Sequence, residues 1–117
     1  MIRIEVKQIS GCTVVRCLTS KLNDEYAIQE WGDELTQAAE SVGKAFVVDF
    51  SQVMFMSSSA LRALITLQKT VALQNVPLLL CGLNDSILEI FKITNLDSIF
   101  KIRKGTEEAI RSLQYLE

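Results

Sequence analysis

The sequence predicts a single α/β domain over residues 1–117, in which a mixed β-sheet is flanked by about four α-helices. The length of 117 residues allows one core and is too short for two ordinary domains. Hydrophobic residues make up 49% of the chain and charged residues 22%, which is typical of a globular protein. The spacing of apolar side chains switches repeatedly between strand-like and helix-like periods, and these switches give the order ββαβαβαβα.

The N-terminal part predicts a β-hairpin followed by a helix. Residues 2–10 and 12–18 alternate apolar and polar side chains and meet at Ser10 and Gly11, which indicates an antiparallel pair. From about Asp24 the period becomes helical, and Gly43 stands where a C-terminal cap is expected. The apolar face of this helix consists of Ile28, Trp31, Leu35, Ala38, Ala39 and Val42.

Two continuous apolar runs, residues 45–50 and 77–83, are typical of central strands that are covered on both faces. The segment between them predicts a helix, so the two strands are expected to be parallel. The apolar stripe of that helix is Leu61, Leu64, Leu67 and Val71, and its polar side is Arg62, Thr66 and Lys69.

The last part of the chain predicts a helix, a strand and a final helix. Asn84 is a suitable N-cap for the first of these helices, and Asn95 can close it in the left-handed conformation. Residues 98–102 have the composition of a strand. Residues 106–108 form a good opening turn for the last helix. That helix would turn Ala109, Ile110 and Leu113 inward.

Composition argues against several classes of function. The 14 acidic and 12 basic residues are scattered and leave a net charge of −2, so no basic stripe is available for nucleic acid. The N-terminus has no apolar signal region, and no stretch approaches the roughly 18 apolar residues of a membrane span, so we expect a cytoplasmic protein with no membrane partner. Cys12, Cys17 and Cys81 are expected to be free thiols, and without histidine or a CxxC motif we expect no metal and no cofactor.

Three consecutive serines, Ser57, Ser58 and Ser59, stand between a strand-like and a helix-like run, where one hydroxyl can cap the helix. A nucleophilic serine is not expected, because the chain has no histidine, no Gly-x-Ser-x-Gly turn and no P-loop. A serine–lysine pair with Lys69 or Lys44 is formally open, although no spacing favours it. A second hypothesis is that one hydroxyl accepts a phosphoryl group, which the helix N-terminus would stabilise.

The stretch VVDFSQVMFMSSSALRAL, residues 47–64, resembles the signature of STAS domains, the family of bacterial anti-sigma factor antagonists. Residues 87–110 resemble the second recurring stretch of that family. The resemblance implies a non-enzymatic regulator that binds a serine kinase acting as an anti-sigma factor. The kinase would phosphorylate the antagonist and release it, and a phosphatase would reset the switch. The resemblance also implies that the first strand of the stretch at residues 47–64 lies at the edge of the sheet.

Carried over by position, the phosphoacceptor is Ser58, with Ser57 and Ser59 as fallbacks, and Arg62 belongs to the partner-binding side of the helix. Asp49 is expected to shape the site or, equally, to make turn hydrogen bonds at the strand end. Ser57 stands where the family usually has aspartate, and Ala60 stands where it usually has glycine. The first change removes a negative charge near the helix start.

Two alternatives remain open from the sequence. One is a STAS scaffold that is never phosphorylated and assembles with itself or with other STAS proteins. The other is a domain that senses a small ligand or a nucleotide at the helix N-terminus, where backbone N–H groups favour anions. The oligomeric state is not predicted.

Overall fold

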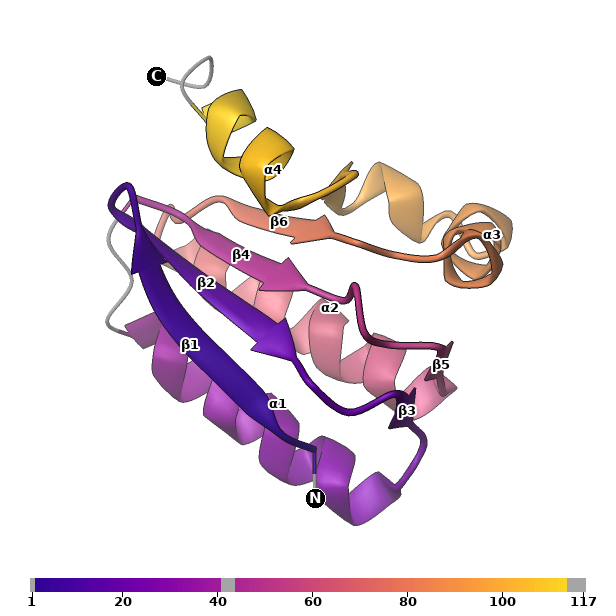
Figure 1. Cartoon of the computed structure of the whole chain (residues 1–117). Helices are drawn as coiled ribbons and strands as arrows, with labels where there is room; N and C mark the ends of the chain where they lie inside the picture. The colour runs from indigo at the N-terminus through magenta and orange to yellow at the C-terminus, as the bar shows by residue number, and fades with distance from the viewer. Residues whose placement is uncertain (1, 41–43, 114–117) are drawn as a thin grey trace.

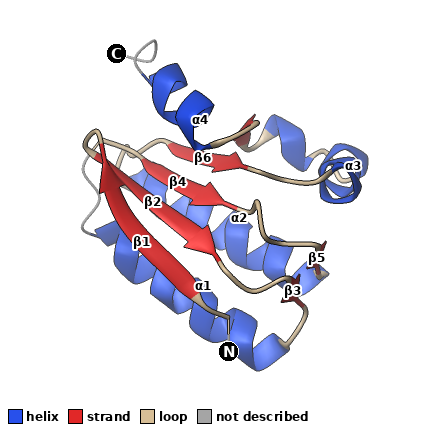
Figure 2. Ribbon diagram, in the orientation of Figure 1, coloured by secondary structure: helices blue, strands red, loops and turns tan. Residues whose placement is uncertain are grey.

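The computed structural model describes residues 2–40 and 44–113. They form one sheet of five strands, a small sheet of two strands, four α-helices and one 3₁₀ turn (Figures 1 and 2). The strands are β1 Ile4–Ile9, β2 Cys12–Cys17, β3 Lys21–Leu22, β4 Phe46–Asp49, β5 Phe55–Met56, β6 Leu78–Cys81 and β7 Lys101–Arg103. The helices are α1 Glu25–Glu40, α2 Ser58–Leu73, α3 Asp85–Ile93 and α4 Thr106–Leu113, with the 3₁₀ turn η1 at Leu96–Ser98.

The five-stranded sheet has the order β1-β2-β4-β6-β7. β1 and β2 are antiparallel, while the β2–β4, β4–β6 and β6–β7 pairs are parallel. The hairpin turn at Ser10 and Gly11 has φ values of 53° and 81°, and two positive values in a two-residue loop match the twist of paired strands. The predicted hairpin, the parallel pair and the mixed sheet are therefore confirmed.

The two faces of this sheet are covered unequally. Side chains of α1, α2 and α3 pack on one face and form the larger core, in which Trp31, Phe50 and Phe91 are fully buried. The other face carries a smaller core beneath α4, where Ala109 is buried and Ile110 and Leu113 are partly buried. Figure 1 shows α4 alone on its side of the strands, with α1 and α2 behind them.

Three details of the predicted fold differ from the structure. The short parallel strands β3 and β5 were not predicted, because two residues are too few to show a period. The strand expected at residues 98–102 pairs with β6 only from Lys101, since the preceding residues belong to the turn after Asn95. β4 lies at the centre of the sheet, as its apolar run predicts, so the edge position implied by the resemblance is wrong. The predicted residues Val42 and Gly43 lie outside the described residues.

Candidate functional site

The segment before α2 is fixed by backbone hydrogen bonds to the chain that leaves β2. The N–H groups of Met54 and Phe55 both donate to the carbonyl of Ser20, at 2.7 and 3.1 Å. The N–H of Ser57 donates to the carbonyl of Leu22 at 2.9 Å. These bonds set the direction in which the chain enters α2, so the serines occupy a defined turn.

Asn84 ties the same segment to the start of α3. Its side-chain amide nitrogen lies 3.4 Å from the carbonyl of Val53 and 3.3 Å from that of Met54. Its side-chain oxygen accepts from the N–H of Ile87 at 2.8 Å and caps α3, as the sequence predicts. The sequence could not show the first role, because those partners are about 30 positions away in the chain.

Ser57 is the N-cap of α2. Its backbone is extended, with φ −79° and ψ 169°, and its hydroxyl accepts from the N–H of Ala60 at 3.4 Å. This distance is long for a hydrogen bond, so the cap is weak. One of the three serines therefore has the predicted capping role. Ala60, which stands where glycine is usual in the pattern that the sequence resembles, is fully buried in the core.

Ser58 and Ser59 face different surroundings. Ser58 is the first residue of α2 and is exposed, whereas Ser59 is half-buried. Ser59 and Arg62 line a groove of about 460 Å³ between α1 and α2, which also contains Glu25 and Asp33. The structure thus brings the predicted site residues together on the first turns of α2, with Ser58 on the open surface.

Two exposed apolar side chains precede these serines. Met54 is 66% exposed and Phe55 is 49% exposed, although Val53 and Met56 on either side of them are buried. Large apolar groups at the surface often mark contact sites for other proteins. The sequence gives no sign of this exposure, because residues 53–56 form one continuous apolar run without a break.

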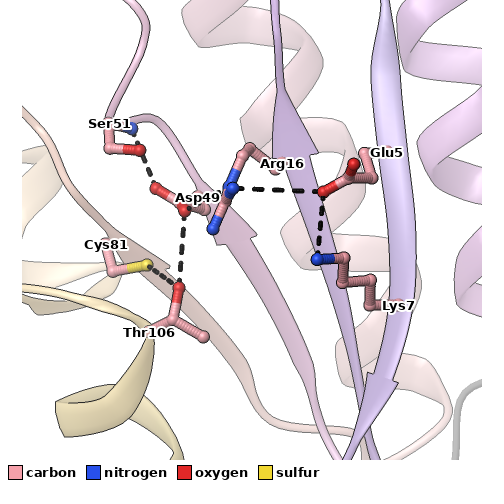
Figure 3. A network of polar contacts seen from close by, with 7 residues as sticks. All are labelled: Glu5, Lys7, Arg16, Asp49, Ser51, Cys81 and Thr106. Carbon is pink, nitrogen blue, oxygen red and sulfur yellow. Dashed lines mark hydrogen bonds and ion pairs between the residues drawn. The ribbon is translucent and has the colours of Figure 1, made fainter.

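Asp49 is not part of the serine surface. Its carboxylate is 4% exposed and accepts from the Arg16 guanidinium at 3.1 Å, from the Ser51 N–H at 2.8 Å and from the Thr106 hydroxyl at 3.4 Å (Figure 3). The interpretation of Asp49 as a carboxylate that makes turn hydrogen bonds is confirmed. These contacts also join β2 and the first residue of α4 to the end of β4, so the carboxylate organises the smaller core.

The three cysteines are free and buried, as predicted. Burial raises the pKa of Cys17 to about 12 and that of Cys81 to about 11, and it also raises the pKa of Cys12. A thiol with such a pKa is protonated at neutral pH and is a poor nucleophile. The cysteines therefore belong to the packing of the domain.

Over residues 2–40 and 44–113, no group of three or more histidine, cysteine or acidic side chains could hold a metal ion. In the same part of the chain, every helix is too short or too polar to cross a bilayer. The arrangement at the start of α2 offers instead an exposed hydroxyl, free backbone N–H groups and a neighbouring apolar surface. These groups can accept a modification or contact a protein.

Comparison with known proteins places this architecture in a family. The chain is 25% identical over 107 residues to BtrV of Bordetella bronchiseptica, which carries the name of an anti-sigma factor antagonist, and the match covers 92% of this chain and 90% of that protein. An anti-sigma factor antagonist from Mycobacterium paratuberculosis superimposes with a TM-score of 0.85 at 18% identity, covering 97% of this chain and 95% of that one.

The anti-sigma factor antagonist SpoIIAA in its unphosphorylated form superimposes with a TM-score of 0.72 at 16% identity, over 96% of this chain and 98% of that one. The same protein from Bacillus, in its phosphorylated form, gives 0.71 at 18% identity, over 95% and 99%. The family model of the STAS domain matches residues 3–109, nearly the whole chain, and the chain therefore belongs to the STAS domain family.

Proposed function

We propose that this protein is a regulatory binding module of the anti-sigma factor antagonist type, which acts in the cytoplasm and has no catalytic activity of its own. Its partner is a serine kinase that is also an anti-sigma factor. Phosphorylation of Ser58 by that kinase ends the interaction, and a phosphatase restores it. Ser57, Ser59 and Arg62 contribute to the contact surface.

The observation that carries this proposal is the exposure of Ser58 in the first turn of α2, beside the exposed Met54 and Phe55. The other two serines are less suitable acceptors, because Ser57 caps the helix and Ser59 faces the groove. The likeness to SpoIIAA, which has been solved in a phosphorylated form, supports phosphorylation as the switch.

The physical basis of the switch is a change of charge on a surface that otherwise keeps its shape. Phosphoserine carries roughly −1.5 to −2 charges at pH 7. The first turn of α2 contains no acidic side chain, so the helix dipole stabilises the phosphate by about 0.3 to 2 kcal/mol. The domain keeps its fold, while a partner that fits a neutral hydroxyl meets repulsion and loses solvation.

The first test is phosphopeptide mass spectrometry on the protein from its own cells, grown under several stresses. We expect phosphate on Ser58, with an occupancy that changes with conditions. Ser86 is a matched internal control, because it is also exposed in the first turn of a helix. Phosphate on both serines alike would mean that exposure alone determines modification, and a well-detected peptide that never carries phosphate would favour the scaffold alternative.

The second test measures binding of the parent, Ser58→Ala, Ser58→Asp and Ser86→Asp proteins to the kinase recovered with the parent. Ser58→Asp should weaken the complex at least tenfold, or about 1.4 kcal/mol, while Ser58→Ala and Ser86→Asp should bind like the parent. Equal binding by all four proteins would contradict the switch.

A further inference from the structure

Strand β1 has one side without a neighbouring strand, because it is at the end of the sheet order. The carbonyl of Arg3 accepts from the N–H of Leu18, and its N–H donates to the hydroxyl of Thr19, both at 2.8 Å. Arg3 therefore turns both backbone groups toward β2. Since this direction alternates along an antiparallel pair, the backbone groups of the even-numbered residues point away from the sheet. These residues are Ile4, Val6 and Gln8.

The hairpin turn supports the same alternation independently. A two-residue turn with positive φ at both positions is closed by a pair of residues that exchange hydrogen bonds with each other. Here that pair is Ile9 and Cys12. Ile9 thus turns inward like the other odd-numbered residues, so Val6 presents a free N–H and a free carbonyl to a further strand.

The helices cover the middle of this edge strand incompletely. Val6 is 49% exposed, whereas its cross-strand neighbour Val15 and the next residue on that face, Cys17, are fully buried. The helices that cover this face therefore shield β2 fully and the outer strand only at Ile4, which packs against the larger core. Figure 1 shows β1 at the outer side of the sheet, with α1 behind it and, among the described residues, no further strand beside it.

The side chains that flank Val6 carry opposite charges. Glu5 and Lys7 lie on the same face of the sheet as α4, but α4 does not cover them at this edge. The Lys7 ammonium lies 3.5 Å from the Glu5 carboxylate. Both side chains are exposed. A strand with the order acid, apolar residue, base is complementary to a second copy of itself that runs in the opposite direction.

We propose that β1 pairs with β1 of a second copy of this chain around a twofold axis at Val6, which joins the two sheets into one. In this register the backbone groups of Val6 bond to those of the second copy's Val6. Glu5 lies opposite the second copy's Lys7, and Lys7 lies opposite the second copy's Glu5. The interface is isologous, as in most two-subunit proteins, and it does not depend on the function of Ser58.

Registers centred on Glu5, Lys7 or Ile4 fit less well. An axis at Glu5 or at Lys7 places like charges opposite each other, which is destabilising. An axis at Ile4 brings Arg3 opposite Glu5, but it pairs only Ile4 with a residue of the same strand, whereas the axis at Val6 pairs residues 4–8 with one another. In that register Lys7 would have no partner within the strand, so a change at Lys7 identifies the register.

Sedimentation velocity of the full chain over a range of concentrations tests this pairing. The parent should show a reversible monomer–dimer equilibrium. Lys7→Glu and Glu5→Lys should each weaken self-association roughly tenfold, because each places like charges opposite each other at two symmetric positions. An equimolar mixture of the two variants should recover dimers, since one copy then carries two acids and the other two bases. Recovery would also show that both variants are folded.

Lys101→Glu is the matched control, because Lys101 is an exposed lysine on β7, the strand at the opposite edge of the sheet. It should associate like the parent. A parent that stays monomeric at every concentration would overturn the proposal, as would Lys7→Glu associating like the parent or a mixture that recovers no dimer. Dimers that weaken with Lys101→Glu and not with Lys7→Glu would assign the interface to β7.

Discussion

Two connections lead from neighbouring parallel strands into helices, and they are built differently. β4 reaches α2 through residues 50–57, a longer path that includes β5, whereas β6 reaches α3 through residues 82–84. Both helices begin with an extended cap residue of nearly the same geometry, Ser57 at φ −79° and ψ 169° and Asn84 at φ −74° and ψ 169°. The difference therefore lies in what surrounds each cap.

The start of α3 has an acidic side chain and a short cap hydrogen bond, while the start of α2 has neither. α3 has a 2.8 Å cap bond and Asp85 in its first turn. α2 has a 3.4 Å cap bond and no acidic residue in its first turn. An acidic side chain at a helix N-terminus typically contributes 0.3–1 kcal/mol, so α2 lacks a stabilisation that α3 has. The first turn of α2, which we assign to partner binding, can thus stabilise the negative charge of an added phosphate.

The largest change in stability should come from a substitution in the short connection between β6 and α3. Gly82 has φ +74°, and a Cβ there would lie 2.7 Å from the Ser51 nitrogen and 2.8 Å from an Asp49 carboxylate oxygen. Gly82→Ala should therefore lower the free energy of unfolding by about 3 kcal/mol, since backbone strain and overpacking combine. Urea denaturation monitored by tryptophan fluorescence measures this loss of stability.

Gly32→Ala is the control for this change. A Cβ at Gly32 meets only the Ala63 methyl group, at 3.6 Å, so that substitution should raise stability by about 0.5–1 kcal/mol, as expected for alanine inside a helix. Equal stability of the Gly82→Ala and parent proteins would show that the short connection can move to accommodate the Cβ, and would contradict this prediction.

A smaller effect should follow from Asn84→Ala, which removes the α3 cap and the two contacts to the α2 connection. We expect a loss of about 1.5 kcal/mol, mostly from the cap. Asn84→Ser keeps a capping oxygen but cannot reach the carbonyls of Val53 and Met54, so its loss should be small. Both variants should speed hydrogen exchange at the amides of Met54 and Phe55. Unchanged exchange in both would mean that Asn84 does not hold the α2 connection.

Local features of the sequence predicted most of the fold. The hairpin, a cap by one of the three serines, the cap at Asn84 and the left-handed Asn95 depend on a few adjacent residues, and the structure confirms them. The buried runs of β4 and β6 could be recognised from composition alone. By contrast, the pairing of Asp49 with Arg16 spans 33 positions and depends on the β2–β4 register, which no local pattern contains.

The candidate site was only partly predictable for the same reason. The serines were found because three of them stand at a strand-to-helix change, and their family resemblance singled out Ser58. Met54 precedes and Phe55 begins the two-residue strand β5, which pairs with β3, and only the next residue, Met56, is buried. Such short strands show no period, so the exposure of these residues could not be recognised from the sequence.

The smallest expected effect tests whether α2 lacks a negative charge, and it uses the residue that departs from the family pattern. Aspartate and serine are comparable N-caps, so Ser57→Asp should preserve the cap and add an interaction with the helix dipole. We expect a gain of about 0.5 kcal/mol in the free energy of unfolding at low salt, and a loss of only about 0.5 kcal/mol for Ser57→Ala, because the cap bond is long.

The dependence of this gain on pH and salt identifies its origin. A carboxylate stabilised by the dipole has a lower pKa in the folded state than its unfolded value of about 3.9, so its contribution is complete above that pH and disappears as the pH falls through the folded value. Salt should screen the same contribution. Denaturation at pH 7 and pH 3, each at low and high salt, separates the outcomes. A gain that persists at pH 3 would come from packing, and the contrast between the two helix starts would then not be electrostatic.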